Sequence, residues 1–75
     1  MVYDIVVDTL CDQLDLDEND ISMDSSLVDD LDIDSITYYE IIMELEDEFD
    51  IEIPDEAAED MRTVSDLVNY IEARV

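Results

Sequence analysis

The sequence predicts an all-α protein: a small four-helix bundle of three main helices and one short helix, with a long ordered loop between the first two. Three observations favour this fold class. Apolar residues recur at helical spacing in three stretches, no alternating strand pattern persists, and 75 residues with 48% hydrophobic content suffice for one small core. We therefore expect residues 1–75 to form a single domain.

The first helix is expected over residues 2–14. Val2, Val6 and Leu10 are spaced by four, so their side chains share one face of a helix. Residues 15–34 have no regular period, but apolar residues are scattered through them: Leu16, Ile21, Met23, Leu27, Leu31 and Ile33. We expect these side chains to hold a long ordered connection against the core, with one helical turn in it.

The clearest helix is predicted for residues 35–50. One stripe of this helix is apolar and should pack: Tyr38, Ile41, Ile42, Leu45 and Phe49. The opposite side should meet solvent or a partner, and it carries Ile36, Glu40, Met43, Glu44 and Asp47. Asp34 or Ser35 can cap the helix, because either side chain can accept a hydrogen bond from a backbone N–H of the first turn.

Two further helices are predicted beyond Pro54, which disfavours helix at the residue before it. A short helix is expected over residues 55–61, with Asp55 as its cap. Thr63 and Asp66 then have the spacing of a capping box. Apolar residues at helical spacing continue to the end of the chain: Val64, Leu67, Val68, Ile71 and Val75.

Composition excludes several functional classes. With 25 acidic and 2 basic residues the formal net charge is −23, which excludes nucleic acid as a direct partner, because phosphate binding needs clustered Lys and Arg. The chain has no Gly for a phosphate-binding loop and no His for general base catalysis at neutral pH. One Cys gives no internal disulfide, and no signal peptide or membrane span is evident. We expect a monomeric cytoplasmic protein.

The acidic clusters do not match known metal or catalytic sites. Asp30, Asp32 and Asp34 resemble the start of an EF-hand loop, but Ser35 stands at the sixth position instead of Gly and Ile41 at the twelfth instead of Glu. Paired carboxylates could in principle perform acid and base chemistry, but so short a chain has little material for a walled cleft. We therefore expect no metal site and no catalytic residue.

The single thiol and the tyrosines are expected to be structural. Cys11 has many acids and no base near it in sequence, which disfavours its thiolate, so a packing role is predicted. Tyr38 should lie in the core, Tyr3 and Tyr70 at its boundary, and Tyr39 in solvent.

Ser35 is the remaining candidate for chemistry. It stands where the loop meets the longest helix, so its side chain should be accessible near the positive end of the helix dipole. Simple capping of the helix is the alternative role. No base is positioned to make the hydroxyl a nucleophile, so another protein must install any phosphoryl group that Ser35 carries.

Two segments carry a family resemblance. L-D-I-D-S-I at residues 31–36 and E-I-I-M-E-L-E-D-E-F-D-I-E-I-P-D-E at residues 40–56 resemble an acyl carrier protein of the type II fatty-acid synthase kind. The likeness covers nearly the whole chain without a gap. It implies that a Mg²⁺-dependent phosphopantetheinyl transferase attaches 4′-phosphopantetheine from coenzyme A to Ser35. The protein would then carry acyl chains as thioesters between synthase enzymes, would open to admit the chain between helices, and would not itself be an enzyme.

The face of the second helix that should meet partners is both acidic and apolar. With the residues flanking Ser35, we expect it to form the recognition surface: Asp34, Ile36, Glu40, Met43, Glu44 and Asp47. Partner enzymes with basic docking patches would be steered to it. Each exposed ion pair contributes only about 0.2–1 kcal/mol, so binding should be weak and brief.

Some positions depart from the family pattern. Asp32 stands where many members have Gly, Ile36 where Leu is usual, Thr37 where an acid is common, and Tyr39 where a smaller aliphatic residue is frequent. These departures leave open a specialised carrier for polyketide or D-alanine pathways. An acidic interaction domain without a prosthetic group is the alternative from a different class, and a divalent-ion sensor is the third.

Overall fold

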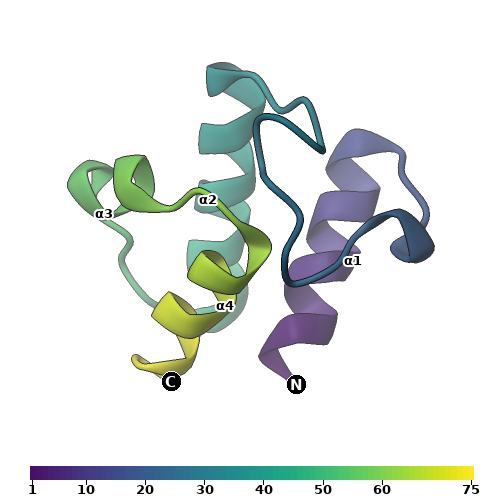
Figure 1. Cartoon of the computed structure of the whole chain (residues 1–75). Coiled ribbons are helices and arrows are strands. Elements are labelled where there is room, and N and C mark those ends of the chain that lie inside the picture. The colour runs from purple at the N-terminus through teal and green to yellow at the C-terminus, as the bar shows by residue number, and fades with distance from the viewer.

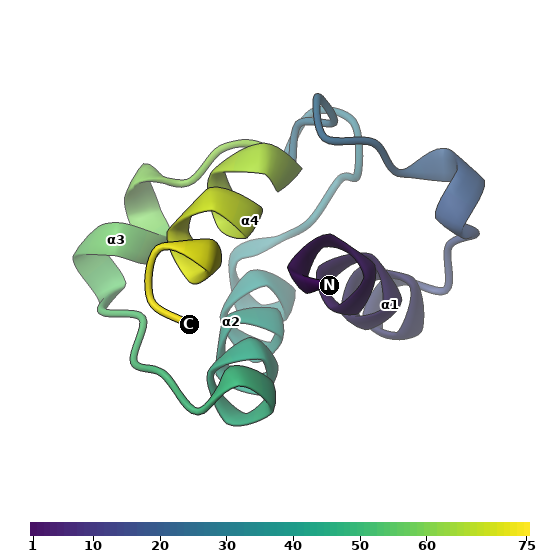
Figure 2. The same cartoon turned by 90° about the horizontal axis from the view of Figure 1, so that it is seen from below.

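The computed structural model describes all 75 residues and contains four α-helices and one short 3₁₀ helix, which confirms the predicted all-α bundle. In chain order the elements are α1 (Val2–Leu14), η1 (Glu18–Asp20), α2 (Ser35–Phe49), α3 (Asp55–Asp60) and α4 (Val64–Glu72). Helix α1 packs against α2 and α4. Figures 1 and 2 show α3 on the side of the bundle away from α1, and the two termini lie at the same end.

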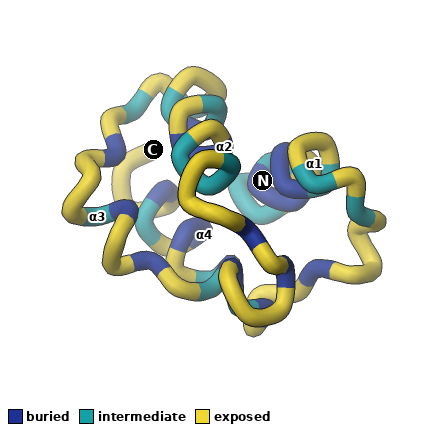
Figure 3. The backbone as a smooth tube through the Cα atoms, turned by 90° about the horizontal axis from the view of Figure 1, so that it is seen from above, coloured by how far each residue is buried: buried dark blue, intermediate teal, exposed yellow.

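The core is built from the apolar stripes that the periodicity predicted. Seventeen buried hydrophobic residues form one cluster, and the fully buried ones include Leu10 of α1, Ile41 and Leu45 of α2, and Leu67 and Ile71 of α4. Figure 3 shows buried stretches on α1, α2 and α4 toward the middle of the bundle and exposed stretches around its outside. Burial of apolar surface from three helices is therefore what holds the bundle together.

Two helices end at aspartates with left-handed backbone. Asp15 has φ 55° and donates its N–H to the Cys11 carbonyl, which ends α1, and Asp50 has φ 54° and donates to Glu46, which ends α2. Glycine usually takes this position because it lacks a Cβ, but the chain contains none. Aspartate tolerates the left-handed region better than most residues, so it ends these helices here.

The long connection between α1 and α2 is ordered and is pinned at several points. It contains the single helical turn that was expected, η1, and it buries Ile21, Leu27, Leu31 and Ile33. It also pairs with the start of α4: Leu27 N–H donates to the Arg62 carbonyl at 2.8 Å, and Val64 N–H donates to the Ser25 carbonyl at 3.1 Å. These bonds fix the approach of the chain to α2.

Several local predictions were wrong. Helix α3 begins at Asp55 with Pro54 in the cap position and no side-chain cap, so Asp55 lies inside the helix. Helix α4 ends at Glu72, and Val75 is 64% exposed instead of packed. The Met23 side chain is 37% exposed and lies outside the core cluster, so only the Met23 carbonyl holds the loop, by accepting the Ser65 N–H at 3.0 Å. Tyr39 is half-buried against the core.

Candidate functional site

Ser35 lies at the first position of α2 with an exposed side chain. Asp34 caps the helix: its Oδ1 accepts the Thr37 N–H at 2.8 Å, and its own backbone is extended. The Ser35 hydroxyl takes part in no hydrogen bond with the protein. Capping by Ser35, the alternative role, is therefore wrong, because the neighbouring carboxylate already performs it.

The segment before Ser35 is held rigidly. Leu31 and Ile33 are buried, and Ile33 N–H donates to the Leu27 carbonyl at 3.1 Å. Between them Asp32 has left-handed backbone with φ 53°, a conformation that glycine adopts most readily. Leu31 and Ile33 therefore anchor the segment in the core, and Ser35 lies exposed at the end of this ordered loop.

The electrostatics around Ser35 are set by Asp34. Hydrogen bonds from Thr37 lower the pKa of the Asp34 carboxyl, so it is an anion at neutral pH. A carboxylate with a lowered pKa is a weak base, and its lone pairs already serve the helix. The site therefore offers an accessible hydroxyl without an activating group.

The predicted recognition residues do not all face the same way. Ile36 and Met43 are 75% and 58% exposed, and Glu40 and Asp47 are also exposed. Glu44 differs, because it is half-buried and its Oε2 accepts a hydrogen bond from Gln13 Nε2 of α1 at 2.6 Å. The structure thus joins Glu44 to α1, while the other helix-face residues extend into solvent along α2.

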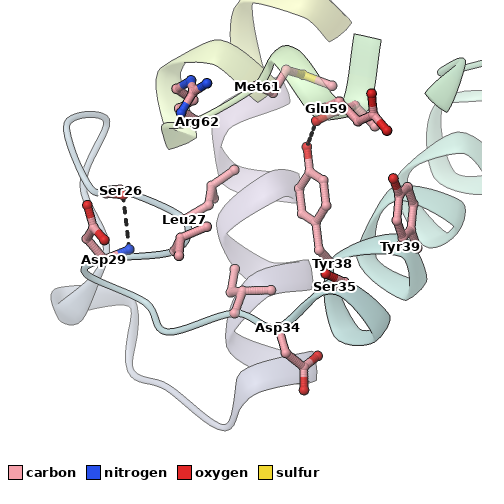
Figure 4. Close-up of a pocket in the computed structure, with 13 residues that line it drawn as sticks. Ser26, Leu27, Asp29, Asp34, Ser35, Tyr38, Tyr39, Glu59, Met61 and Arg62 are labelled. Atoms are coloured by element: carbon pink, nitrogen blue, oxygen red, sulfur yellow. Dashed lines mark hydrogen bonds between the residues drawn. The ribbon is translucent and has the colours of Figure 1, made fainter. Parts of the chain in front are cut away.

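An open cavity of about 450 Å³ lies beside Ser35, between the long loop, α2 and the α3 region. Its apolar lining comes from three separate segments: Leu27, Val28, Ile33, Tyr38, Tyr39, Ala58 and Met61. Figure 4 shows Asp34 and Ser35 at one edge and Met61 and Arg62 at another. Sequence reasoning missed this cavity, because no local pattern tells that residues 27 and 61 are neighbours.

Val28 is a surface residue that the sequence analysis missed. It lines the cavity and is 66% exposed, so it adds an apolar side chain on the loop side of Ser35. It lies in a segment with no regular period, so no helical spacing could assign it to a face. The exposed apolar surface around Ser35 is therefore wider than one face of α2.

The acidic residues of this region serve the backbone. Asp30 Oδ2 accepts the Ser26 N–H at 2.7 Å, just as Asp34 caps α2. No group of three or more His, Cys, Asp or Glu side chains is placed to hold a metal ion.

The Cys11 thiol of α1 is half-buried. Burial raises its pKa, and the charge of Asp8 raises it further, in keeping with the packing role predicted for it.

No helix of the structure has both the length and the apolar character that a membrane crossing requires.

Comparison with known proteins agrees with this geometry. The family model described as "Phosphopantetheine attachment site" matches residues 4–71. The acyl carrier protein of Clostridium acetobutylicum is 53% identical over 73 residues, covering 97% of this chain and 95% of its own. That of Clostridium perfringens is 44% identical over 70 residues, covering 93% and 92%.

Solved structures give the same result. The acyl carrier protein of Enterococcus faecalis has a TM-score of 0.84 at 36% identity, with 99% of this chain and 94% of that chain covered. A candidate acyl carrier protein of Mycobacterium tuberculosis has a TM-score of 0.94 at 33% identity, with both chains fully covered. The resemblance found in the sequence is thereby confirmed, and the chain belongs to the acyl carrier proteins, the family that carries acyl groups on 4′-phosphopantetheine.

Proposed function

We propose that Ser35 is the attachment site of 4′-phosphopantetheine and that the chain delivers acyl groups to the enzymes of fatty-acid synthesis. The observation that supports this most strongly is the exposed hydroxyl of Ser35, which is left without a hydrogen-bond partner because Asp34 caps α2. When bound, the group supplies a thiol on which acyl chains are held as thioesters. The cavity beside Ser35 is the place where such a chain would be sheltered.

The chain's own residues present the site and do not catalyse its modification. In the transfer from coenzyme A, the Ser35 oxygen forms a bond to phosphorus, the bond to adenosine 3′,5′-bisphosphate breaks, and the hydroxyl proton must go to a base. Asp34 is a poor base because its pKa is lowered. A separate phosphopantetheinyl transferase must therefore supply the base, and we propose that this protein is a carrier and not an enzyme.

Mass spectrometry tests the attachment site. Incubation of the folded apo-protein with coenzyme A, Mg²⁺ and a promiscuous transferase should add about 340 Da, the mass of the phosphopantetheine group. Ser35→Ala should abolish the gain. Ser26→Ala is the matched control, because Ser26 lines the same cavity, and it should leave the gain intact. An unchanged mass for the folded wild type would refute the proposal and favour an acidic interaction domain.

Docking of partners is proposed to use the exposed residues around Ser35. Asp34, Glu40 and Asp47 supply charge, and Ile36 and Met43 supply apolar area between them. Because these carboxylates are exposed, each ion pair with a basic patch should be weak. Glu44 is bonded to Gln13, so its contribution should be smaller than those of Glu40 and Asp47.

The transferase itself is a suitable probe of this surface. Glu40→Lys or Asp47→Lys should raise its KM for the apo-protein by about 1.4- to 5-fold at low salt, with little effect at high salt. Glu72→Lys on α4 is a control of equal charge change. If Glu72→Lys raised KM as much as the α2 variants, the effect would be one of net charge and not of this surface.

The expected cytoplasmic location and monomeric state are part of the same proposal. Fractionation of the native host and analytical ultracentrifugation of the purified protein test them directly.

A further inference from the structure

Tyr38 crosses the cavity beside Ser35. It lies on α2 one turn after Ser35 and is half-buried, and its hydroxyl donates a hydrogen bond to the Ala58 carbonyl oxygen of α3 at 2.5 Å. In Figure 4 the ring stands between Leu27 and Tyr39, with the hydroxyl directed at α3. One side chain thus both occupies the cavity and connects two of its walls.

Helix α3 has few other attachments. It has six residues, of which Ala58 is the only buried one, and no side chain caps its start. It makes no extensive contact with another helix. The Tyr38 bond is the single side-chain hydrogen bond between α2 and α3. Breaking this bond should therefore loosen α3 itself, whereas the 2.8 Å bond from the Ile53 N–H to Glu46 Oε2 holds only the segment that leads into α3.

The bond is suited to stay formed under ordinary conditions. Burial raises the pKa of the Tyr38 hydroxyl to about 12, so it remains a protonated donor at neutral pH. The same Ala58 carbonyl also accepts the Met61 N–H at 3.3 Å, which closes the end of α3. Loss of the tyrosine hydroxyl should therefore also speed hydrogen exchange at the amide of Met61, which follows the last residue of α3.

We propose that Tyr38 is a specificity-determining residue, which limits the length of the linear acyl chain that the cavity shelters. The inference rests on the proposed function of Ser35 as the attachment site. The ring takes up space between Leu27 and Tyr39, and the hydroxyl fastens α3 so that the cavity cannot widen. A short chain fits beside the closed ring, whereas a longer one must break the Tyr38–Ala58 bond and displace α3.

The apo-protein tests the fastening by hydrogen exchange. In Tyr38→Phe the amides of Ala58 and Met61 should exchange about 2- to 12-fold faster than in the wild type, the change expected from loss of one hydrogen bond. Amides in the middle of α1 and α4 should not change. Tyr39→Phe is the matched control, because Tyr39 lines the same cavity and its hydroxyl makes no hydrogen bond with the protein. Equal exchange in wild type and Tyr38→Phe would overturn the inference.

Loaded protein tests the chain-length limit. The transferase attaches butanoyl, octanoyl or hexadecanoyl arms from the matching acyl-coenzyme A, and the gain in Tm over the unacylated form reports sheltering of the chain. In the wild type, we expect the gain in Tm to stop rising at a shorter acyl chain than it does in Tyr38→Phe and Tyr38→Thr. Tyr39→Phe should follow the wild type.

The two proposals fail in different ways. An unchanged mass after incubation with the transferase would refute the attachment site at Ser35. Successful loading followed by the same chain-length profile in wild type, Tyr38→Phe and Tyr38→Thr would overturn the role of Tyr38 alone.

Discussion

Repulsion among the carboxylates should make the stability of this fold strongly dependent on salt. The surface of 4749 Å² carries 25 acidic residues, none of them buried. Each acid therefore has roughly 190 Å² of surface, a mean spacing of about 14 Å, and two unit charges at that distance in water repel by about 0.3 kcal/mol. The single ion pair joins the Met1 amino group to Asp4 at 3.9 Å, so almost nothing is neutralised.

Screening changes this repulsion several-fold within the usual range of buffers. With a Debye length of about 30 Å at 10 mM salt, each neighbouring pair retains about 0.2 kcal/mol, and with about 8 Å at 150 mM it retains about 0.05 kcal/mol. With about six neighbours per charge, raising the salt from 10 to 150 mM lowers the repulsion energy of the folded state by about 10 kcal/mol. The unfolded chain, whose acids are also close in sequence, cancels more than half of this, so we expect a net gain of about 2–4 kcal/mol.

Thermal unfolding followed by circular dichroism measures the effect. For a domain of this size the gain corresponds to a rise in Tm of about 10–25 °C between 10 and 150 mM KCl. Millimolar Mg²⁺ should act at lower concentration than K⁺. Replacing Asp4, Asp8 and Asp12 with Asn changes the net charge from −23 to −20. This triple variant should show a smaller rise in Tm over the same range of salt. A Tm that moves by less than about 2 °C would mean that the repulsion is not the dominant electrostatic term.

Three further outcomes are expected. Asp32→Gly should raise the free energy of unfolding by about 0.5 kcal/mol in urea denaturation, because the left-handed backbone at φ 53° is less favourable for aspartate than for glycine. This gain is partly offset because glycine has more conformational freedom in the unfolded chain. Asp32→Val should lower the free energy of unfolding. Hydrogen bonds from the backbone N–H groups of Arg62 and Thr63 lower the pKa of Asp66, so their stabilisation is complete above its unfolded value of 3.8 and is lost as pH falls through the lower folded value. The stability difference between wild type and Asp66→Asn should shrink over that acid range, and a constant difference would contradict the assignment. Burial raises the pKa of Tyr38 to about 12, so its contribution is present below pH 10 and is lost as pH rises toward 12; absorbance titration at alkaline pH should lose its last tyrosinate transition in Tyr38→Phe.

The helices could be predicted from the amino-acid sequence, because their signals are local. Apolar residues repeated every three or four positions place Leu10, Ile41 and Leu67 on buried faces whatever the partner helix is. The capping box of Thr63 and Asp66 acts within three residues, and it forms as predicted. The placement of Ser35 at a loop-to-helix junction is local in the same sense.

Ends of helices were predicted less well, because several outcomes are locally compatible. Either Asp34 or Ser35 could have capped α2, and the extended backbone of Asp34 decided between them. Asp55 could have capped α3, but Pro54 fixes the backbone one residue earlier and Asp55 became helical. Differences of a few tenths of a kcal/mol separate such alternatives, and the packing of the flanking segments settles them.

The surroundings of Ser35 depend on contacts between residues that are far apart in the sequence. The cavity joins Leu27 to Met61, the Tyr38 hydroxyl reaches a carbonyl 20 residues away, and Glu44 turns to Gln13 31 residues away. Such contacts follow from how helices and loops pack, and each is one of many that the same polar and apolar residues could make. Local spacing can therefore tell which face of a helix is apolar, but the partner on that face is set by the three-dimensional packing of the whole chain.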